Sequence, residues 1–207
     1  MVIDSDADPE AVGVRIGTDN IEAGYMAAQA ALDAREGELI VGIINYDLGS
    51  RNGQEREQGL RERLAQEARV GEIYTLNVLA EEDDAREKTM ALLQAHPEIN
   101  LVVGFNEPTA VGAAQAVEAL ALGETVDVVG FDSNVKTVDL MQTGVVSALI
   151  VQNPYAMGYL GVEAACDILG GESFDPEQLV DTATQIVTQE NMFSLEGQKA
   201  LFPFDTP

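Results

Sequence analysis

The chain has 207 residues, 46% of them hydrophobic, which is enough to bury the core of one large domain or of two small lobes. Its 36 acidic residues outnumber its 11 basic ones and leave a formal net charge of −25, so the surface repels phosphates and no nucleic acid is expected as a partner. No apolar stretch approaches the ~20 residues with which a helix crosses a bilayer.

The first predicted elements are two short strands and a helix. The opening "MVIDS" is typical of the end of a buried strand followed by polar residues, and residues 11–20 contain a second strand. A helical pattern then places Ile21 and Tyr25 on one face, after an N-terminal cap at Asp19 with Glu22 three residues later. The chain therefore alternates strand and helix almost from its first residue.

Apolar runs and helical patterns continue to alternate through the middle of the chain. Five runs are predicted to be strands: 38–45, 70–79, 99–105, 126–132 and 145–151. Apolar residues at helical spacing mark the helices between them: Leu60 and Leu64, Met90 and Leu93, Ala110 and Ala114, Val138 and Met141. Because the runs are almost continuously apolar, we expect parallel strands that are buried on both faces. Residues 18–151 are therefore predicted to form one doubly wound α/β unit with a parallel sheet.

A good helix and a weak strand follow this unit. In residues 153–171, Asn153 is the predicted cap, Pro154 opens the first turn and Gly170 marks the end. Residues 183–189 then have the pattern of a weak strand. Cys166, the only cysteine, stands among alanines in this helix and is predicted to be a small buried residue.

Polar side chains stand at the carboxyl ends of the predicted strands. Asn106, Asp132 and Gln152 end three of them, and Gln54 and Arg56 begin the helix after the first strand of the unit. Ligands of open parallel sheets bind outside these ends, so we expect the side chains to converge there. Structural roles remain open for several: Asn106 and Asp132 are suited to cap helices, and Arg56 to pair with neighbouring acids. Gln152 has no evident structural role.

These groups are rich in hydrogen-bonding oxygens and amides and poor in acid–base machinery. A carboxylate accepts from two adjacent hydroxyls and an amide both donates and accepts, which favours a small neutral polyol as ligand. His96, the only histidine, precedes a proline, and neither a catalytic triad nor a zinc site is expected. A hydrolase that uses Asp4 and Asp132 is an alternative, but nothing marks one of them as the acid. We therefore expect a binding protein rather than an enzyme, with no cofactor and no metal.

The chain resembles a known family along most of its length. Five stretches carry the resemblance in order: "VIDSD", "GTDNIEAGYMAA", "LLQAHPEINLVVGFNEPTAVGAAQAV", "VDVVGFDSN" and "ALIVQNPYAMGYLGVEAA". Together they are similar to the type I periplasmic sugar-binding proteins, the solute-binding components of ABC transporters. The resemblance implies a sugar as ligand, a membrane permease as partner and a periplasmic or other extracytoplasmic location, although no signal-peptide pattern is present in this chain.

The resemblance also implies which residues bind the sugar. The implied ligand-binding positions are Asp4, Gln54, Asn106, Asp132 and Gln152. Further positions near the ligand are Ser5, Arg56 and Asp84. The sequence departs from the family in two places: Gln54 stands where an arginine is frequent, and residues 83–85 lack the family's aromatic side chain. These departures weaken the case for ribose, and the sequence does not name the sugar.

Family members have two lobes joined by three crossings and close over the sugar by a hinge. The resemblance implies that this chain is the C-terminal lobe with orphaned segments of the N-terminal lobe, most of which would precede residue 1. The implied segments are 1–17 (last strand of that lobe and first crossing), 18–151 (C-terminal lobe), 152–180 (hinge and helix of the N-terminal lobe) and 181–207 (returning strand and tail). Without most of one lobe, sugar binding is expected to be weak or absent.

Two further expectations follow from this organisation. Apolar faces left exposed on the orphaned segments favour a homo-oligomer or a domain-swapped dimer. The alternative function is the effector-binding core of a lactose-repressor-type transcriptional regulator, which shares the fold. The stretch "QNPYAMGYLGVEAA" and the charge of −25 favour transport over DNA binding.

Overall fold

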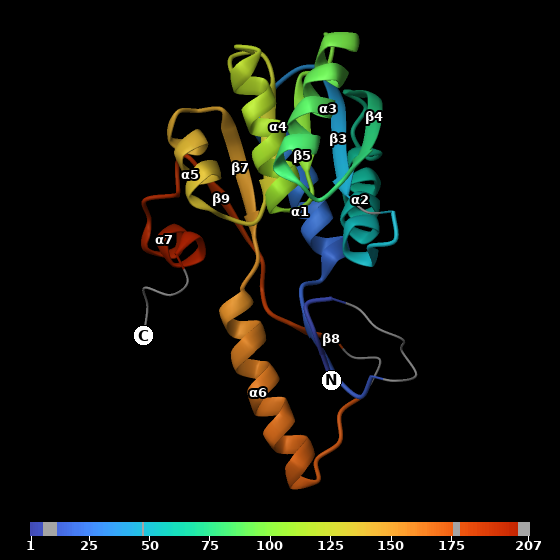
Figure 1. The fold of residues 1–207 in the computed structure, drawn as a ribbon, viewed down its shortest axis with the longest axis vertical. Helices are drawn as coiled ribbons and strands as arrows, with labels where there is room; N and C mark the ends of the chain where they lie inside the picture. Colours follow the sequence, from blue (N-terminus) through green and yellow to red (C-terminus); the bar gives the residue numbers. More distant parts are fainter. Residues whose placement is uncertain (6–11, 47, 176–178, 203–207) are drawn as a thin grey trace.

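The computed structural model describes residues 1–5, 12–46, 48–175 and 179–202, which form two β-sheets (Figure 1). The larger sheet has six strands in the order β4-β3-β5-β6-β7-β9, and the smaller has three in the order β1-β2-β8. The strands are β1 (Val2–Ile3), β2 (Arg15–Gly17), β3 (Leu39–Tyr46), β4 (Val70–Val78), β5 (Leu101–Gly104), β6 (Asp127–Phe131), β7 (Val146–Val151), β8 (Leu179–Asp181) and β9 (Gln185–Thr188). The helices are α1 (Asn20–Ala34), α2 (Arg51–Leu64), α3 (Glu82–Ala95), α4 (Glu107–Ala119), α5 (Val135–Gln142), α6 (Pro154–Gly170) and α7 (Leu195–Leu201).

The larger sheet is parallel except at one edge. Strands β4, β3, β5, β6 and β7 pair in parallel, which confirms the predicted doubly wound α/β fold. The edge strand β9 runs antiparallel to β7, with Val187 opposite Leu149. Strand β7 runs toward the smaller sheet. The chain enters β9 from the smaller sheet, so β9 runs beside β7 in the opposite direction.

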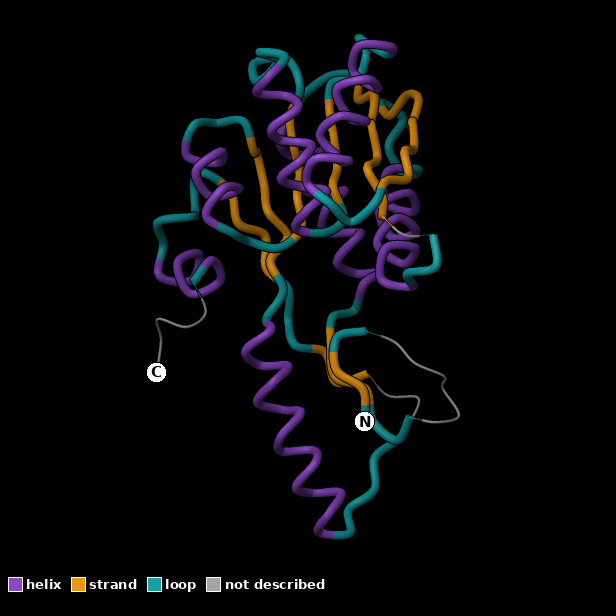
Figure 2. Tube along the Cα trace, in the orientation of Figure 1, coloured by secondary structure: helices purple, strands orange, loops and turns teal. Residues whose placement is uncertain are grey.

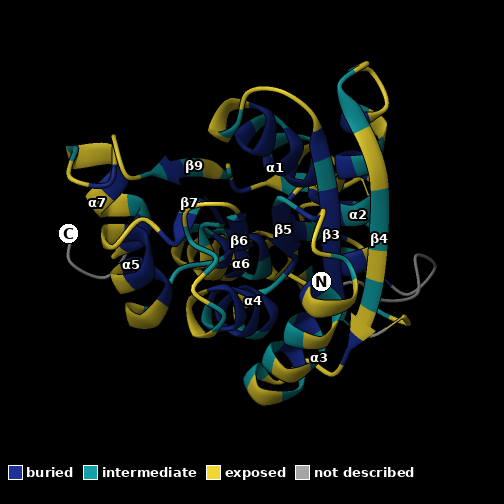
Figure 3. Ribbon diagram, turned by 90° about the horizontal axis from the view of Figure 1, so that it is seen from above, coloured by how far each residue is buried: buried dark blue, intermediate teal, exposed yellow. Residues whose placement is uncertain are grey.

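Helices cover both faces of the larger sheet (Figure 3). Val41 and Val103 share one apolar core with α1 and α2. Val102 and Val128 belong to the core on the other face, with α3, α4 and α5. Successive residues of a strand point to opposite faces, so both must be apolar where both faces are covered. This burial explains the continuous apolar runs in the sequence.

Helix α6 packs along the smaller sheet and extends away from the larger one (Figures 1 and 2). Ala164 shares a small core with Val14 and Ile16. Gly161 faces Ile3 so closely that a Cβ at residue 161 would lie 2.4 Å from the Cδ1 atom of Ile3. The predicted burial of Cys166 is wrong, because Cys166 is exposed. It lies two residues beyond Ala164, about 200° around the helix from the packed face.

Helix α6 carries exposed apolar side chains: Tyr155, Tyr159, Val162 and Leu169 on the side opposite its packed face, and Ile168 one turn beyond Ala164. Association of copies through such a face stays a prediction. No helix in the described part of the chain is both long enough and apolar enough to span a membrane.

Hydrogen bonds tie the segments that connect the two sheets. The backbone N–H and the Oγ1 hydroxyl of Thr182 donate to the Gly17 carbonyl at 2.9 and 3.1 Å. The backbone N–H of Asp19 donates to Oδ1 of Asp181 at 3.1 Å. The β2–α1 and β8–β9 connections therefore lie side by side, and the smaller sheet faces the carboxyl ends of the larger sheet's parallel strands (Figure 2).

Candidate functional site

A cavity of about 700 Å³ lies between the two sheets, at the carboxyl ends of β6 and β7. The residues that line it come from β1, β7, α4, α6 and α7 and from the chain directly after β1, β6, β7 and α7. They are Ile3, Asp4, Glu107, Asp132, Ser133, Val151, Gln152, Pro154, Met157, Gly158, Ala200, Leu201 and Phe202. Of the sequence-predicted site residues, the structure thus brings together Asp4, Asp132 and Gln152. These three come from different strand ends and from both sheets.

Asp132 is held rigidly at the end of β6. Its backbone has a φ of 65°, in the left-handed region that aspartate tolerates better than most residues. Its Oδ1 accepts a hydrogen bond from Nε2 of Gln152 at 2.5 Å, and its Oδ2 accepts from the backbone N–H of Glu107 at 3.1 Å. Each carboxylate oxygen retains acceptor capacity for a further donor. Asp132 is therefore a fixed double acceptor that faces the cavity.

Gln152 has its carboxamide orientation fixed by the groups around it. Its Oε1 accepts from Oγ1 of Thr18 at 2.9 Å and from Nη2 of Arg56 at 2.8 Å. These two donors occupy both lone pairs of Oε1, so Nε2 must face Asp132. One N–H of Nε2 bonds Asp132, and the second remains for a ligand. Gln152 consequently acts toward a ligand as a donor only.

Arg56 lies behind the cavity rather than in it. The residue is only 2% exposed, and its Nε and Nη1 donate to Oδ1 of Asn20 at 2.8 Å and to the Phe105 carbonyl at 2.7 Å. The guanidinium also stacks over the ring of Phe131, 4.5 Å from its centroid. These acceptors are neutral groups, not the neighbouring acids that the sequence suggested as partners. Arg56 thus contributes to the site by holding Gln152.

Asp4 and Ser5 follow the end of β1. Asp4 has a φ of 64°, like Asp132, and its backbone N–H donates to the Ile16 carbonyl at 2.9 Å. Asp4 lines the larger cavity from the smaller sheet, and Asp132 lines it from the larger sheet. The backbone N–H of Ser5 donates to the Ile3 carbonyl at 2.8 Å, and Ser5 does not line the larger cavity.

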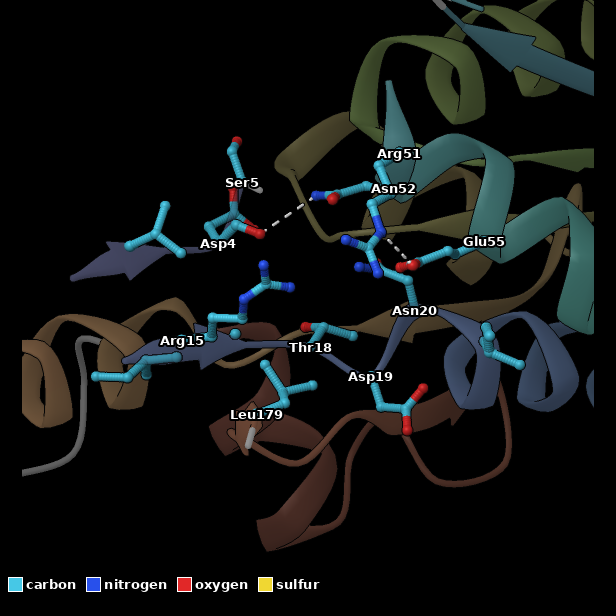
Figure 4. A pocket seen from close by; sticks show the side chains of 14 residues that line it. Asp4, Ser5, Arg15, Thr18, Asp19, Asn20, Arg51, Asn52, Glu55 and Leu179 are labelled. Atoms are coloured by element: carbon cyan, nitrogen blue, oxygen red, sulfur yellow. Dashed lines mark hydrogen bonds and ion pairs between the residues drawn. The ribbon is translucent and has the colours of Figure 1, made fainter. Parts of the chain in front are cut away.

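A second, smaller cavity of about 210 Å³ also has Asp4 in its lining (Figure 4). Ser5, Arg15, Asn52 and Leu179 are among its lining residues. The Nδ2 group of Asn52 approaches the backbone carbonyl of Asp4 at 3.5 Å, a long contact that joins α2 to the smaller sheet. This cavity contains neither Asp132 nor Gln152, and the larger one is therefore the candidate site.

Besides Ser5 and Arg56, three further predicted positions lie outside the larger cavity. Asn106 caps α4: its Oδ1 accepts from the backbone N–H and the Oγ1 hydroxyl of Thr109, at 3.1 and 2.7 Å. Gln54 donates through Nε2 to the Leu48 carbonyl and is exposed on the first turn of α2. Asp84 accepts from the Leu79 backbone N–H at 2.7 Å and stabilises the start of α3.

Lys88 influences Asp84 directly. Its Nζ lies 2.8 Å from Oδ2 of Asp84. The Lys88 hydrogen bond, together with that of the Leu79 N–H, holds the pKa of the Asp84 carboxyl below its ordinary value. Asp84 therefore behaves as a structural carboxylate at the surface.

Sequence reasoning missed several residues of the cavity. Glu107 and Ser133 directly follow the predicted residues Asn106 and Asp132, and adjacency is the signal that would have found them. The wall formed by α7 gives no local signal, because it comes from far along the chain. Glu107 is oriented by Asn134, whose Nδ2 donates to its Oε1 at 2.8 Å.

The lining of the cavity is negatively charged. Its charged lining residues are Asp4, Glu107 and Asp132, and no lysine or arginine joins them among the described residues. Such a site accepts hydrogen bonds from hydroxyl groups and repels anions. Within the described ranges, no three acidic, histidine or cysteine side chains gather as a metal-binding group.

Comparison with known proteins places this geometry in a wider context. A family model described as a periplasmic binding protein domain matches residues 1–173. The ribose import binding protein of Bacillus subtilis (strain 168) is 28% identical over 192 residues, which are 92% of this chain and 60% of that protein. The Escherichia coli (strain K12) ribose import binding protein is 29% identical over 188 residues, 87% of this chain and 60% of that protein. The chain thus spans about 60% of the length of these curated relatives.

Solved structures agree with these sequence matches. A carbohydrate transporter solute binding protein from Agrobacterium radiobacter, in complex with D-arabinose, superposes with a TM-score of 0.90 at 29% identity, covering 96% of this chain and 69% of that one. An ABC transporter solute binding protein from Agrobacterium vitis with bound D-fucose gives a TM-score of 0.89 at 25% identity, covering 97% and 69%.

Proposed function

Because the chain belongs to the periplasmic binding protein domain family, we propose that it binds a small neutral sugar in the cavity lined by Asp4, Asp132 and Gln152. The observation that carries the proposal is the Asp132–Gln152 pair. The 2.5 Å hydrogen bond and the two donors to Oε1 of Gln152 fix one double acceptor beside one donor. Two adjacent hydroxyls donate to the carboxylate, and a ring or hydroxyl oxygen accepts from the amide.

The acidity of the cavity supports a neutral ligand. Asp4, Glu107 and Asp132 face it without a basic lining residue within the described ranges. A sugar phosphate or a uronic acid would bring a second negative charge into this field at a cost in free energy. Hydroxyl groups instead satisfy the carboxylates without adding charge.

The arrangement of the sheets supports closure around the ligand. Asp4 lines the cavity at the smaller sheet and Asp132 lines it at the larger one, and short chain segments such as residues 18–19 and 182–184 run between the two sheets. A sugar that donates to both carboxylates links the two sheets and stabilises the closed arrangement. In this proposal Arg56 and Thr18 hold Gln152, and Asn106 and Asp84 stabilise their helices rather than bind sugar.

For the whole protein we propose the role of solute-binding component of an ABC transporter, outside the cytoplasm, with a membrane permease as partner. The relatives and structures reported above are import or transporter binding proteins, and none of those reported supports the regulator alternative. This protein would bind its ligand and release it unchanged.

Saturation-transfer NMR on the 207-residue chain tests the site, because it detects weak binding. D-ribose, D-arabinose and D-allose serve as neutral probes, and D-glucuronate as the anionic one. We expect millimolar binding of at least one neutral sugar and none of D-glucuronate. Asp132→Asn should weaken sugar binding by about tenfold, since an amide no longer accepts through both oxygens.

Asp139→Asn is the matched control, because Asp139 is an exposed aspartate on α5 outside the cavity. It should bind like the wild type. Equal binding by the Asp132→Asn variant and the wild type, or no transfer to any neutral sugar, would contradict the proposal.

A further inference from the structure

Helix α7 supplies one wall of the larger cavity. Its last residues, Ala200 and Leu201, line the cavity together with Phe202, which follows the helix. Figure 1 shows α7 beside α5, close to the C-terminal end of the chain. The family match ends at residue 173, so this wall lies outside the part of the chain that the match covers.

The wall is anchored to the loop that carries Asp132. Leu201 is 5% exposed and belongs to the core on one face of the larger sheet. Its carbonyl accepts a hydrogen bond from Oγ of Ser133 at 3.2 Å, and Ser133 directly follows Asp132. The backbone N–H of Phe202 donates to the Gln198 carbonyl at 2.9 Å. Phe202 therefore has a defined position relative to the carboxylate.

Phe202 differs from the rest of the lining. It is the one aromatic residue among the described residues that line the cavity, and 38% of it is exposed. Met157, on α6, is one of several smaller apolar side chains in the lining, which also include Val151 and Leu201. An exposed phenylalanine in a cavity that also holds carboxylates creates a site with one apolar and one polar side.

A cyclic sugar has the same two-sided character. Its hydroxyl groups point outward around the ring, while its C–H groups form an apolar face. The π face of an aromatic ring is electronegative and attracts polarised C–H groups, and covering it removes apolar surface from water. A ring-form sugar with its hydroxyls on Asp132 and Gln152 leaves a C–H face for an apolar wall.

Resting on the proposed function, we infer that Phe202 is a specificity-determining residue that packs against the C–H face of the bound sugar. The wall selects ring-form sugars over open-chain alditols of the same carbon configuration, because only the ring presents a flat C–H face. D-arabinose and D-arabitol are therefore the discriminating pair of probes.

The test compares Phe202→Ala and Phe202→Leu with matched changes at Phe193. Phe193 is 72% exposed, lies in the turn before α7 and does not line the cavity. In the NMR titration, Phe202→Ala should bind D-arabinose about tenfold more weakly, in line with the loss of an aromatic contact surface. It should also lose the preference for D-arabinose over D-arabitol, whereas Phe193→Ala should keep both properties.

A second readout reports contact directly. Saturation of aromatic protons should transfer to the sugar C–H protons in the wild type and in Phe193→Leu, and should disappear in Phe202→Leu even where the sugar still binds. Thermal unfolding monitors the fold of every variant. If the Phe202 variants keep the wild-type affinity for D-arabinose and the wild-type aromatic transfer, the role inferred for Phe202 is wrong while the proposed sugar binding stands. If the wild-type chain binds none of the neutral sugars, the proposed function itself is wrong.

Discussion

Replacing Arg56 with methionine removes the centre of the polar network behind the cavity. The side chain is 2% exposed and donates to Asn20, the Phe105 carbonyl and Gln152 at 2.7 to 2.8 Å. Methionine fills much of the same volume but has no donor. Oδ1 of Asn20 and the Phe105 carbonyl would then lose this donor, and Oε1 of Gln152 would keep only the hydrogen bond from Thr18.

The loss of these bonds sets the expected magnitude. Each buried acceptor left without a donor costs about 1–3 kcal/mol. Removing a buried charge gives back part of that cost, so we expect the free energy of unfolding to fall by about 3–5 kcal/mol. With a urea slope of about 2 kcal/mol/M, the midpoint of unfolding should shift by about 1.5–2.5 M.

Urea denaturation followed by far-ultraviolet circular dichroism measures this shift. Arg61→Met is the matched control, because Arg61 is on the same helix and pairs with Glu57 at the surface, with 41% of its side chain exposed. The control should lose only about 0.5 kcal/mol. Arg56→Lys should fall between the two, since it keeps the charge but not the planar fork. Equal midpoints for Arg56→Met and Arg61→Met would refute the reasoning.

Two further outcomes follow from packing and from charge. Gly24→Ala should destabilise the fold by about 3 kcal/mol, since its Cβ would lie 2.1 Å from the backbone oxygen of Arg56. Gly158→Ala meets no atom within 4 Å and should gain about 0.5–1 kcal/mol; thermal unfolding that ranks the two variants alike would contradict this packing. The lowered pKa of Asp84 stabilises the fold above its ordinary value of 3.8, and this contribution is lost as the pH falls through the lowered pKa. Asp84→Asn should therefore lower the melting temperature near neutral pH, and the difference from the wild type should close below about pH 4; a difference that persists in acid would argue against this linkage.

Local patterns in the sequence were sufficient to predict most of the strands and helices, whereas β8 and α7 were not predicted. The continuous apolar runs indicated parallel strands, and the structure confirms them. Asp19, Asn106 and Asn153 were suited to cap helices, and each accepts a hydrogen bond from a backbone N–H three residues later. A cap involves only a few consecutive residues, which is why the sequence alone reveals it.

The polar network was decided by tertiary structure. Gln152 showed no structural role in the sequence, yet its Oε1 accepts from Thr18, 134 residues away, and from Arg56, 96 residues away. Arg56 was expected near the ligand or beside surface acids and instead lies buried behind Gln152. Partners that are so distant in the chain leave no periodic or adjacent pattern.

Burial on α6 and the wall of α7 depended on the same kind of information. A helical pattern places Cys166 on a helix, but only the position of the smaller sheet decides that Ala164 faces inward and Cys166 outward. The sequence by itself determined the alternating α/β fold and the strand ends that carry Asp4, Asp132 and Gln152, because periodicity and capping are local. Tertiary structure alone brought Phe202 to the cavity, because packing joins segments that no local pattern connects.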